Sequence, residues 1–368
     1  MALLLLTSLP AFQRWSAGVA SDFLEEKVGS KVSINNLKLN MLGRVVLDNV
    51  KIFDRRDTLM LQASRIAAKV DLMPLIEKKI RISGAQLIGA KAIIYKDGDE
   101  PFNFQYFVDA FSKKDTTSTP LDLAIGALVV RRGDIRFDKT PSGSPLKGQR
   151  TDKRSFDPNH LHLSDLNLTA RVYFKKPDSL AIDLRNLSFK EQSGLHLQHL
   201  SFEAAAGKHS ASVRDFLLKL PNTNITSQTL SYSPLKGEKM GQEVSPLRGD
   251  LVGSLNGSVC PRDLSCFVPK LANFGDVINL STEVKLANNI LRLPNLSVKD
   301  NGSNISLVCD VTVQDIKDNP SLFADIKELR TGAALQQFLT ENLEGIASPN
   351  PSKGGENRHS GSPLLWRD

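Results

Sequence analysis

The sequence of 368 residues has little cysteine and few aromatic side chains. Its three cysteines, Cys260, Cys266 and Cys309, are an odd number, which excludes a scaffold built on disulfides. A bridge between Cys260 and Cys266 stays open. With only two Trp and four Tyr, platforms for stacking bases are scarce, so we expect no nucleic-acid partner. The hydrophobic share of 40% and the charged share of 24% exclude both a polytopic membrane protein and a disordered chain.

Signatures of catalysis are also lacking. The chain has no Walker loop, no GxSxG elbow, no HExxH helix, no dinucleotide fingerprint and no obvious pair of carboxylates for acid and base work. His160 and His162 share one face of a predicted strand and His196 and His199 follow, but no cysteine or carboxylate cluster joins them at ligand spacing. We therefore expect a protein that is not an enzyme, with no cofactor and no metal.

The charge balance of 47 basic to 40 acidic residues, a net +7, admits anionic lipid heads, lipopolysaccharide or nucleic acid as partners without selecting one.

The amino terminus carries an apolar run, Ala2–Leu6, that is much shorter than the roughly 20 residues of a spanning helix. It leads into an amphipathic helix whose apolar residues recur at spacings of three and four. We interpret residues 1–29 as a truncated membrane anchor whose helix lies on an apolar surface. A signal peptide cleaved near Ala20 and an ordinary core-facing helix are the alternatives. The expected membrane-proximal residues are Leu4, Leu6, Phe12, Trp15, Val19 and Phe23.

From Val32 onward the hydrophobic period is two, which predicts strands. Six segments follow one template, apolar-polar-apolar-polar-polar-apolar-polar-apolar, which chance would produce about once in a chain of this composition. Val45–Ile52 and Leu123–Val130 follow it loosely. The strict segments are Val32–Leu39, Ile80–Leu87, Leu161–Leu168, Ile182–Phe189, Leu195–Phe202 and Leu291–Val298.

The doubled polar step in this template shifts the alternation of side chains by one residue. A bulge at that step would keep all four apolar residues on one face and would bend the strand. We therefore expect a mainly β fold: an elongated, curved antiparallel sheet, or half-pipe, with one apolar side, an N-terminal amphipathic helix and a few short helices. A closed β-sandwich is an equal alternative on the sequence alone.

The expected lining of this apolar groove comes from the templates. Short helices over 72–79, 103–111 and 331–343 are expected to plug or edge the sheet. The groove residues are Ile34, Leu39, Ile82, Leu87, Leu163, Leu168, Leu184, Phe189, Leu197, Phe202, Leu293 and Val298.

Near-identical segments rich in Pro and Gly interrupt the pattern at 144–148, 233–237 and 245–249, and we interpret them as loop insertions. The predicted organisation is a membrane-proximal helix over 1–29, β regions over 30–138, 159–232 and 251–345, insertion-like loops over 139–158 and 233–250, and a disordered tail over 346–368.

Several segments in order resemble the amino-terminal part of the AsmA-like family, including its translocation and assembly module (TamB) branch in the form found in Bacteroidetes-like bacteria. The resemblance covers about residues 1–345, is strongest before Asp138, and rests on motifs that are individually degenerate but fairly specific in their order. They are VSINNLKL at 32–39, VKIFD at 50–54, AKVDLMPLIEKKIRIS at 68–83, LIGA at 87–90, YKD at 95–97, NFQYFVDAF at 103–111 and LVVRRGDIRFD at 128–138.

This resemblance implies a periplasmic protein anchored in the inner membrane, with a β-groove that holds phospholipid acyl chains. Such proteins support phospholipid transfer and outer-membrane assembly, in some cases with an Omp85 partner of the TamA type. We expect the chain to be a truncated form of such a protein, because the sequence of 368 residues contains neither the family's complete anchor helix nor the carboxy-terminal region that would meet that partner. The alternative is a secreted or surface β-rich interaction module without lipid. A carbohydrate-active enzyme is a weaker third class, since converging carboxylates are missing.

Overall fold

The structure is a computed structural model that describes residues 10–39, 44–71, 80–112, 121–122, 126–140, 155–176, 179–207, 210–234, 249–302, 305–316 and 320–332. The chain divides into two compact units. Unit 1 comprises Met1–Phe174, Leu180–Ser201 and Asp263–Ala272, and unit 2 comprises Lys175–Ser179, Phe202–Arg262 and Asn273–Asp368.

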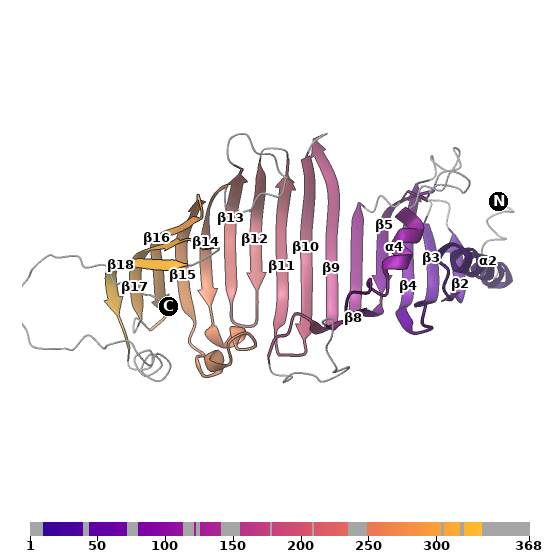
Figure 1. Cartoon of the computed structure of the whole chain (residues 1–368), viewed down its shortest axis with the longest axis horizontal. Helices are drawn as coiled ribbons and strands as arrows, with labels where there is room; N and C mark the ends of the chain where they lie inside the picture. Colours follow the sequence, from indigo (N-terminus) through magenta and orange to yellow (C-terminus); the bar gives the residue numbers. More distant parts are fainter. Residues whose placement is uncertain are drawn as a thin grey trace, which may run out of the picture. The chain divides into compact units, whose positions relative to one another are not determined.

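Unit 1 begins with a 19-residue helix and continues as a series of strands with one further helix (Figure 1). The strand β11 begins in this unit and ends in unit 2. The elements are α2 (Pro10–Val28), β1 (Val32–Ser33), β2 (Asn36–Leu39), β3 (Arg44–Phe53), β4 (Leu59–Asp71), β5 (Ile80–Ile88), β6 (Lys91–Asp97), α4 (Gln105–Ser112), β7 (Leu121–Asp122), β8 (Ala127–Thr140), β9 (His160–Lys176), β10 (Ser179–Glu191), β11 (His196–Ala206) and the 3-10 turns η2 (Pro261–Leu264) and η3 (Pro269–Asn273).

The strands of unit 1 form a mixed sheet. Strand β3 pairs antiparallel with β1, β2 and β4, and β4 pairs antiparallel with β5 and β6. Strand β8 runs parallel to β5 and β6, and antiparallel to β9. Parallel neighbours need a crossover connection, and α4 lies in the connection between β6 and β8. These parallel pairs differ from the antiparallel sheet expected from the sequence.

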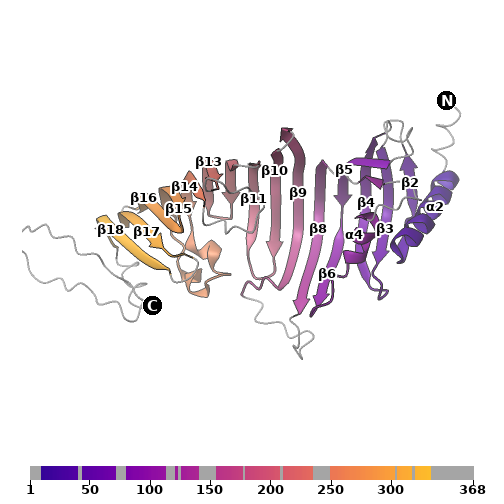
Figure 2. The ribbon, with the colours of Figure 1, turned by 45° about the horizontal axis from the view of Figure 1, so that its top comes forward.

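The core of unit 1 lies between this sheet and the two helices, which sit on one of its faces (Figure 2). Ala17 and Val28 of α2 are buried against Val32, Val50 and Ile52 of the sheet, and Phe104, Tyr106 and Phe107 at α4 pack on the same cluster. The prediction that short helices cover part of the sheet is therefore confirmed for α4, which begins two residues after the expected position. The helices predicted over 72–79 and 331–343 lie outside the described residues, apart from 331–332.

Unit 2 is an antiparallel meander in which each strand pairs with the next. Its hydrophobic period of two along short segments separated by turns is typical of such hairpin-linked strands. The strands are β12 (Ala211–Lys219), β13 (Asn224–Ser233), β14 (Asp250–Val259), β15 (Ile278–Ala287), β16 (Ile290–Asp300), β17 (Ser306–Gln314) and β18 (Ser321–Arg330).

Bulges occur at the doubled polar steps, as the template predicts. In β16, Leu293 pairs with Val311 and Leu296 pairs with Cys309, so that two residues of β16 lie opposite one residue of β17. The second of them, Asn295, has a φ of 51°, in the left-handed region that asparagine tolerates better than most residues. Its backbone N–H donates to the Asp310 carboxylate over 2.6 Å, which holds the bulge.

Other templates behave in the same way. In β9 two residues, Ser164 and Asp165, lie opposite one residue of β8, and Asp165 has a φ of 53°. In β5 the extra residue is Ser83. Since each bulge corrects the phase, the apolar residues on either side of it share one face of the sheet. The predicted fold class, mainly β with an N-terminal helix and few other helices, is confirmed.

Candidate functional site

One face of the unit 2 sheet is apolar over all of its strands. The strand β15 shows this most clearly, because its side chains alternate between shielded and exposed positions along its length. Thr282, Val284 and Leu286 are buried, whereas Glu283 and Lys285 are exposed. We call the side of the sheet that carries Val284 and Leu286 the apolar face of unit 2.

The pairing register shows which residues of the neighbouring strands lie on this face, because residues opposite one another in antiparallel strands point to the same side. Leu286 pairs with Leu251 and Leu291, and Leu291 pairs with Val313. Followed from strand to strand, the face is composed of Val213, Phe216 and Leu218 (β12), Ile225, Leu230 and Tyr232 (β13), Leu251, Leu255 and Val259 (β14), Ile278, Leu280, Val284 and Leu286 (β15), Leu291, Leu293, Leu296 and Val298 (β16), Leu307, Cys309, Val311 and Val313 (β17) and Leu322, Ala324, Ile326 and Leu329 (β18).

The opposite face carries the charged side chains. Glu283, Lys285 and Arg292 lie on it, and an ion pair of 2.8 Å joins the first two. At the bulge of β16, Lys327 bonds to Asp310 over 2.6 Å, and this contact, followed by the hydrogen bond from the Asn295 backbone N–H, lowers the pKa of the Asp310 carboxyl. The two faces therefore differ in chemistry although one sheet carries both.

The apolar face is only partly shielded. Most of its side chains on β14, β16 and β17 are half-buried. On β18, Leu322, Ile326 and Leu329 are exposed, the last to 58%. Among the described residues of unit 2, the paired partners of these strands are other strands of the same sheet and no helix packs on the face. A single layer of this kind leaves oily side chains in contact with solvent, an arrangement that marks interaction sites.

The middle of this face holds a few small or polar buried groups. The Ser227 hydroxyl is buried without a hydrogen-bond partner, and the Thr282 hydroxyl donates to the Glu283 carbonyl over 2.8 Å. Burial raises the pKa of the Cys309 thiol, with a smaller contribution from Asp310, so that the thiol stays neutral on this face. Among the described residues, the one carboxylate that the register places beside this face is Asp300, which pairs with Ile278 at the end of β16 and accepts a hydrogen bond from the Ile305 backbone N–H over 2.9 Å.

The groove residues predicted from the sequence fall into several environments. Leu293 and Val298 lie on the apolar face of unit 2, and Phe202 is a half-buried residue of the same unit. In unit 1, pairing places Leu39, Leu87, Leu163 and Leu168 on the face that carries the core, where Leu39 is 49% exposed and the other three are half-buried. Leu184 and Leu197 are buried, Phe189 is half-buried, and the side chain of Ile82 lies outside the description.

Ile34 is a correction to the expected groove. It is buried in the core beneath α2, and its backbone N–H donates to Ser21 of that helix over 3.1 Å. The template placed it on the apolar side of the sheet, but the helix closes that side at this end of unit 1. Ile34 therefore packs in a closed core and does not line an open groove.

The helix α2 carries a second exposed apolar surface. Ala17 and Val28 face the core, while Trp15, Val19 and Phe23 are exposed to 65%, 51% and 59%. Phe12 packs on Trp15 with ring centroids 5.6 Å apart. We call these four residues the α2 stripe. The core-facing alternative is thus wrong for its three exposed members, while Leu4 and Leu6 lie outside the described residues. No helix in the described part of the chain is long and apolar enough to cross a membrane.

The histidines and cysteines singled out in the sequence have partners or lie buried. His162 contacts Asp134 at 3.2 Å, His160 contacts Asp157 at 2.9 Å, and no group of three potential metal ligands occurs within the described residues. The three cysteines are buried and free, so the bridge left open between Cys260 and Cys266 is not formed.

Sequence reasoning missed most of the apolar face. The strict template is missing from β12, β13, β14, β15, β17 and β18. The pairing register nevertheless places their apolar residues on the same face as those of β16, which follows the template. The simple alternation of apolar and polar residues in β15 and β17 could have identified these two strands from the sequence. No family model, no curated protein and no solved structure matches the chain.

Proposed function

We propose that this chain is a non-enzymatic protein that holds the acyl chains of phospholipids on the apolar face of unit 2. The observation that carries this proposal is a sheet with one apolar and one polar face, whose apolar side chains are mostly half-buried and on β18 exposed. A lipid tail on this face would keep its methylenes out of water while its head stays hydrated. Each methylene removed from water is worth roughly 0.8 kcal/mol, so the many methylenes of an acyl chain together make a large contribution to binding.

A second part of the proposal concerns location. The α2 stripe is a row of large apolar side chains on one side of a helix whose other side is fixed in the core. Aromatic side chains such as Trp15 favour the interface between water and lipid. We infer that the stripe rests on a membrane, and the resemblance to AsmA-like proteins makes this the periplasmic side of an inner membrane.

That resemblance extends the proposal to a role in the cell envelope. It supports a part in phospholipid transfer and in outer-membrane protein assembly, with an outer-membrane Omp85 protein of the TamA type as the partner. These elements rest on the motifs of the amino-terminal half and on no contact in the structure.

The alternative function is a secreted or surface interaction module without lipid. The exposed apolar side chains of β18 are the feature that favours it, because exposed apolar patches mark interaction sites. In that case the apolar face would be covered by protein, not by lipid.

Mass spectrometry of an organic extract tests the main proposal. Full-length protein purified from a bacterial envelope in mild detergent should carry phospholipid that survives removal of the detergent. A fluorescent acyl probe should compete with that lipid. If the extract holds no lipid and the probe does not bind, the proposal of acyl-chain binding is wrong and the interaction module is favoured.

A further inference from the structure

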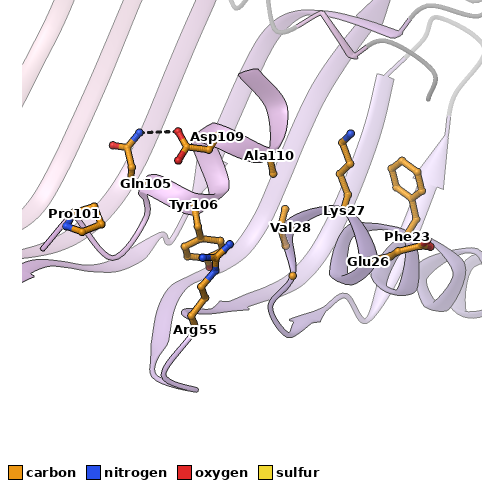
Figure 3. Close-up of a pocket in the computed structure, with 11 residues that line it drawn as sticks. Phe23, Glu26, Lys27, Val28, Arg55, Pro101, Gln105, Tyr106, Asp109 and Ala110 are labelled. Atoms are coloured by element: carbon orange, nitrogen blue, oxygen red, sulfur yellow. Dashed lines mark hydrogen bonds between the residues drawn. The ribbon is translucent and has the colours of Figure 1, made fainter. Parts of the chain in front are cut away.

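A cavity of about 720 Å³ lies in unit 1 between the two helices (Figure 3). Its walls come from the last two turns of α2, the turn after β3, and α4, which supply Phe23, Lys27, Arg55 and Asp109 among others. Neither the template nor the acyl-chain proposal makes use of it.

Hydrogen bonds hold Tyr106 in place as one wall of the cavity. The Tyr106 hydroxyl donates to the Phe53 carbonyl over 2.8 Å and lies 3.0 Å from the Ser30 hydroxyl. Burial raises the pKa of Tyr106, so the ring stays neutral. The Arg55 guanidinium stacks over this ring at 5.1 Å. A cation is therefore held at the wall with its N–H donors available to an anion.

Opposite charges line the same cavity. Asp109 of α4 accepts a hydrogen bond from Gln105 over 2.9 Å, which leaves its carboxylate further acceptor capacity. Glu26 and Lys27 of α2 add one charge of each sign. Two cations and two carboxylates around one space disfavour a simple anion and suit a zwitterion, whose phosphate and ammonium can be matched at the same time.

The rim of the cavity is apolar where it meets the α2 stripe. Phe23 belongs to both the stripe and the cavity wall, and Val28 lines the wall one turn further on. Figure 3 shows Phe23, Glu26 and Lys27 on α2, Gln105 and Asp109 on α4, and Arg55 against Tyr106. A molecule with its polar end in the cavity can thus extend its apolar part along the side of the helix that carries the stripe.

We propose that this cavity binds the head group of a phospholipid that carries a primary ammonium, of the phosphoethanolamine class. The phosphate lies beside Arg55 and Lys27, and the ammonium donates to Asp109 and Glu26. This inference rests on the proposed contact of α2 with a membrane, and it assigns the lipid class that the helix selects there.

Calorimetric titration of the full chain in solution tests the inference without a bilayer. The ligands are dihexanoyl phosphatidylethanolamine, phosphatidylcholine and phosphatidylglycerol below their micelle concentrations, and glycerophosphoethanolamine as the head group alone. We expect phosphatidylethanolamine to bind at least tenfold more tightly than the other two lipids. Arg55→Gln and Asp109→Asn should each weaken it tenfold or more, whereas Lys51→Gln and Asp99→Asn, exposed controls of matched charge, should leave it unchanged.

Several outcomes would overturn the inference. Equal binding of the three lipids, or full binding by Asp109→Asn, excludes the zwitterion site. Binding of glycerophosphoethanolamine as tight as that of the lipid assigns the cavity to a free phosphoamine and excludes a lipid. The acyl probe is titrated into the same variants, because its unchanged binding would show that the lipid site of unit 2 stands while the head-group site fails.

Discussion

Substitutions of two valines on one strand distinguish an apolar face that is open to solvent from one that is sealed in a core. Val311 of β17 lies on the apolar face, paired with Leu293 on one side and Ala324 on the other. Val308, three residues earlier, pairs with Ser297 and Glu328 on the polar face. Both side chains are half-buried. Val311→Asp and Val308→Asp therefore make the same chemical change, at similar exposure, on opposite sides of one sheet.

The expected loss of affinity follows from the contact area. An acyl chain lying over Val311 shields this side chain and two or three methylenes of its own, worth about 2 kcal/mol in total. A carboxylate at this position would have to lose water before the chain could lie on it, so the whole contribution is lost. Because 1.4 kcal/mol corresponds to a factor of ten, Val311→Asp should weaken binding about 30-fold. Val308→Asp should leave binding within about twofold.

Fluorescence titration with an acyl probe gives the affinities, and thermal melts followed by circular dichroism give the stabilities. On an open face both carboxylates stay hydrated, so the melting temperatures of the two variants should lie within a few degrees of each other. Unfolding of Val311→Asp alone would mean that the face is sealed in a core. Equal losses of affinity in the two variants would mean that the probe does not bind to this face.

Two further predictions concern unit 1. Burial alone would raise the pKa of Asp48, but hydrogen bonds and charges from Arg65 and Lys38 lower it overall from 3.8. The ionised carboxylate therefore stabilises the folded state above the unfolded-state pKa, and this contribution is lost as the pH falls through the lowered pKa of the folded state. Asp48→Asn should therefore melt below the wild type at pH 7, with the difference narrowing below about pH 4, and a constant difference across this range would contradict the reasoning. Replacing Trp15 and Phe23 by Ser should reduce flotation with phosphatidylethanolamine vesicles severalfold at unchanged melting temperature, whereas Asp22→Ser on the same helix should not, and equal flotation of all three proteins would exclude the α2 stripe as a membrane contact.

The bulges at the doubled polar steps are the part of the fold that the sequence predicted best. Two consecutive polar residues in an alternating segment require an extra residue in the strand if both apolar pairs are to share a face. Asn295 and Asp165, each with a left-handed φ, and Ser83 are that extra residue in three strands. Asn and Asp are suited to this position because their short polar side chains tolerate the left-handed region.

Other features depend on contacts that no local pattern encodes. The parallel pairing of β8 with β5 and β6 requires knowledge of where the crossover through α4 returns to the sheet. Ile34 fits the template as well as Leu293 does, yet one is covered by a helix and the other is not. In α2 the stripe was recognisable from its spacing, but only the packing of Ala17 and Val28 decides which side faces the core.

The central claim is that acyl chains lie on the apolar face of unit 2, and scanning β16 with a photo-crosslinking amino acid tests it most directly. A phospholipid with a radioactive tail should crosslink to the probe at positions 291, 293, 296 and 298 and not at 292, 297 or 299. The three-residue step between 293 and 296 reflects the bulge at Asn295. Crosslinks that alternate without this step, that appear equally on both faces, or that are absent at all seven positions would contradict the account.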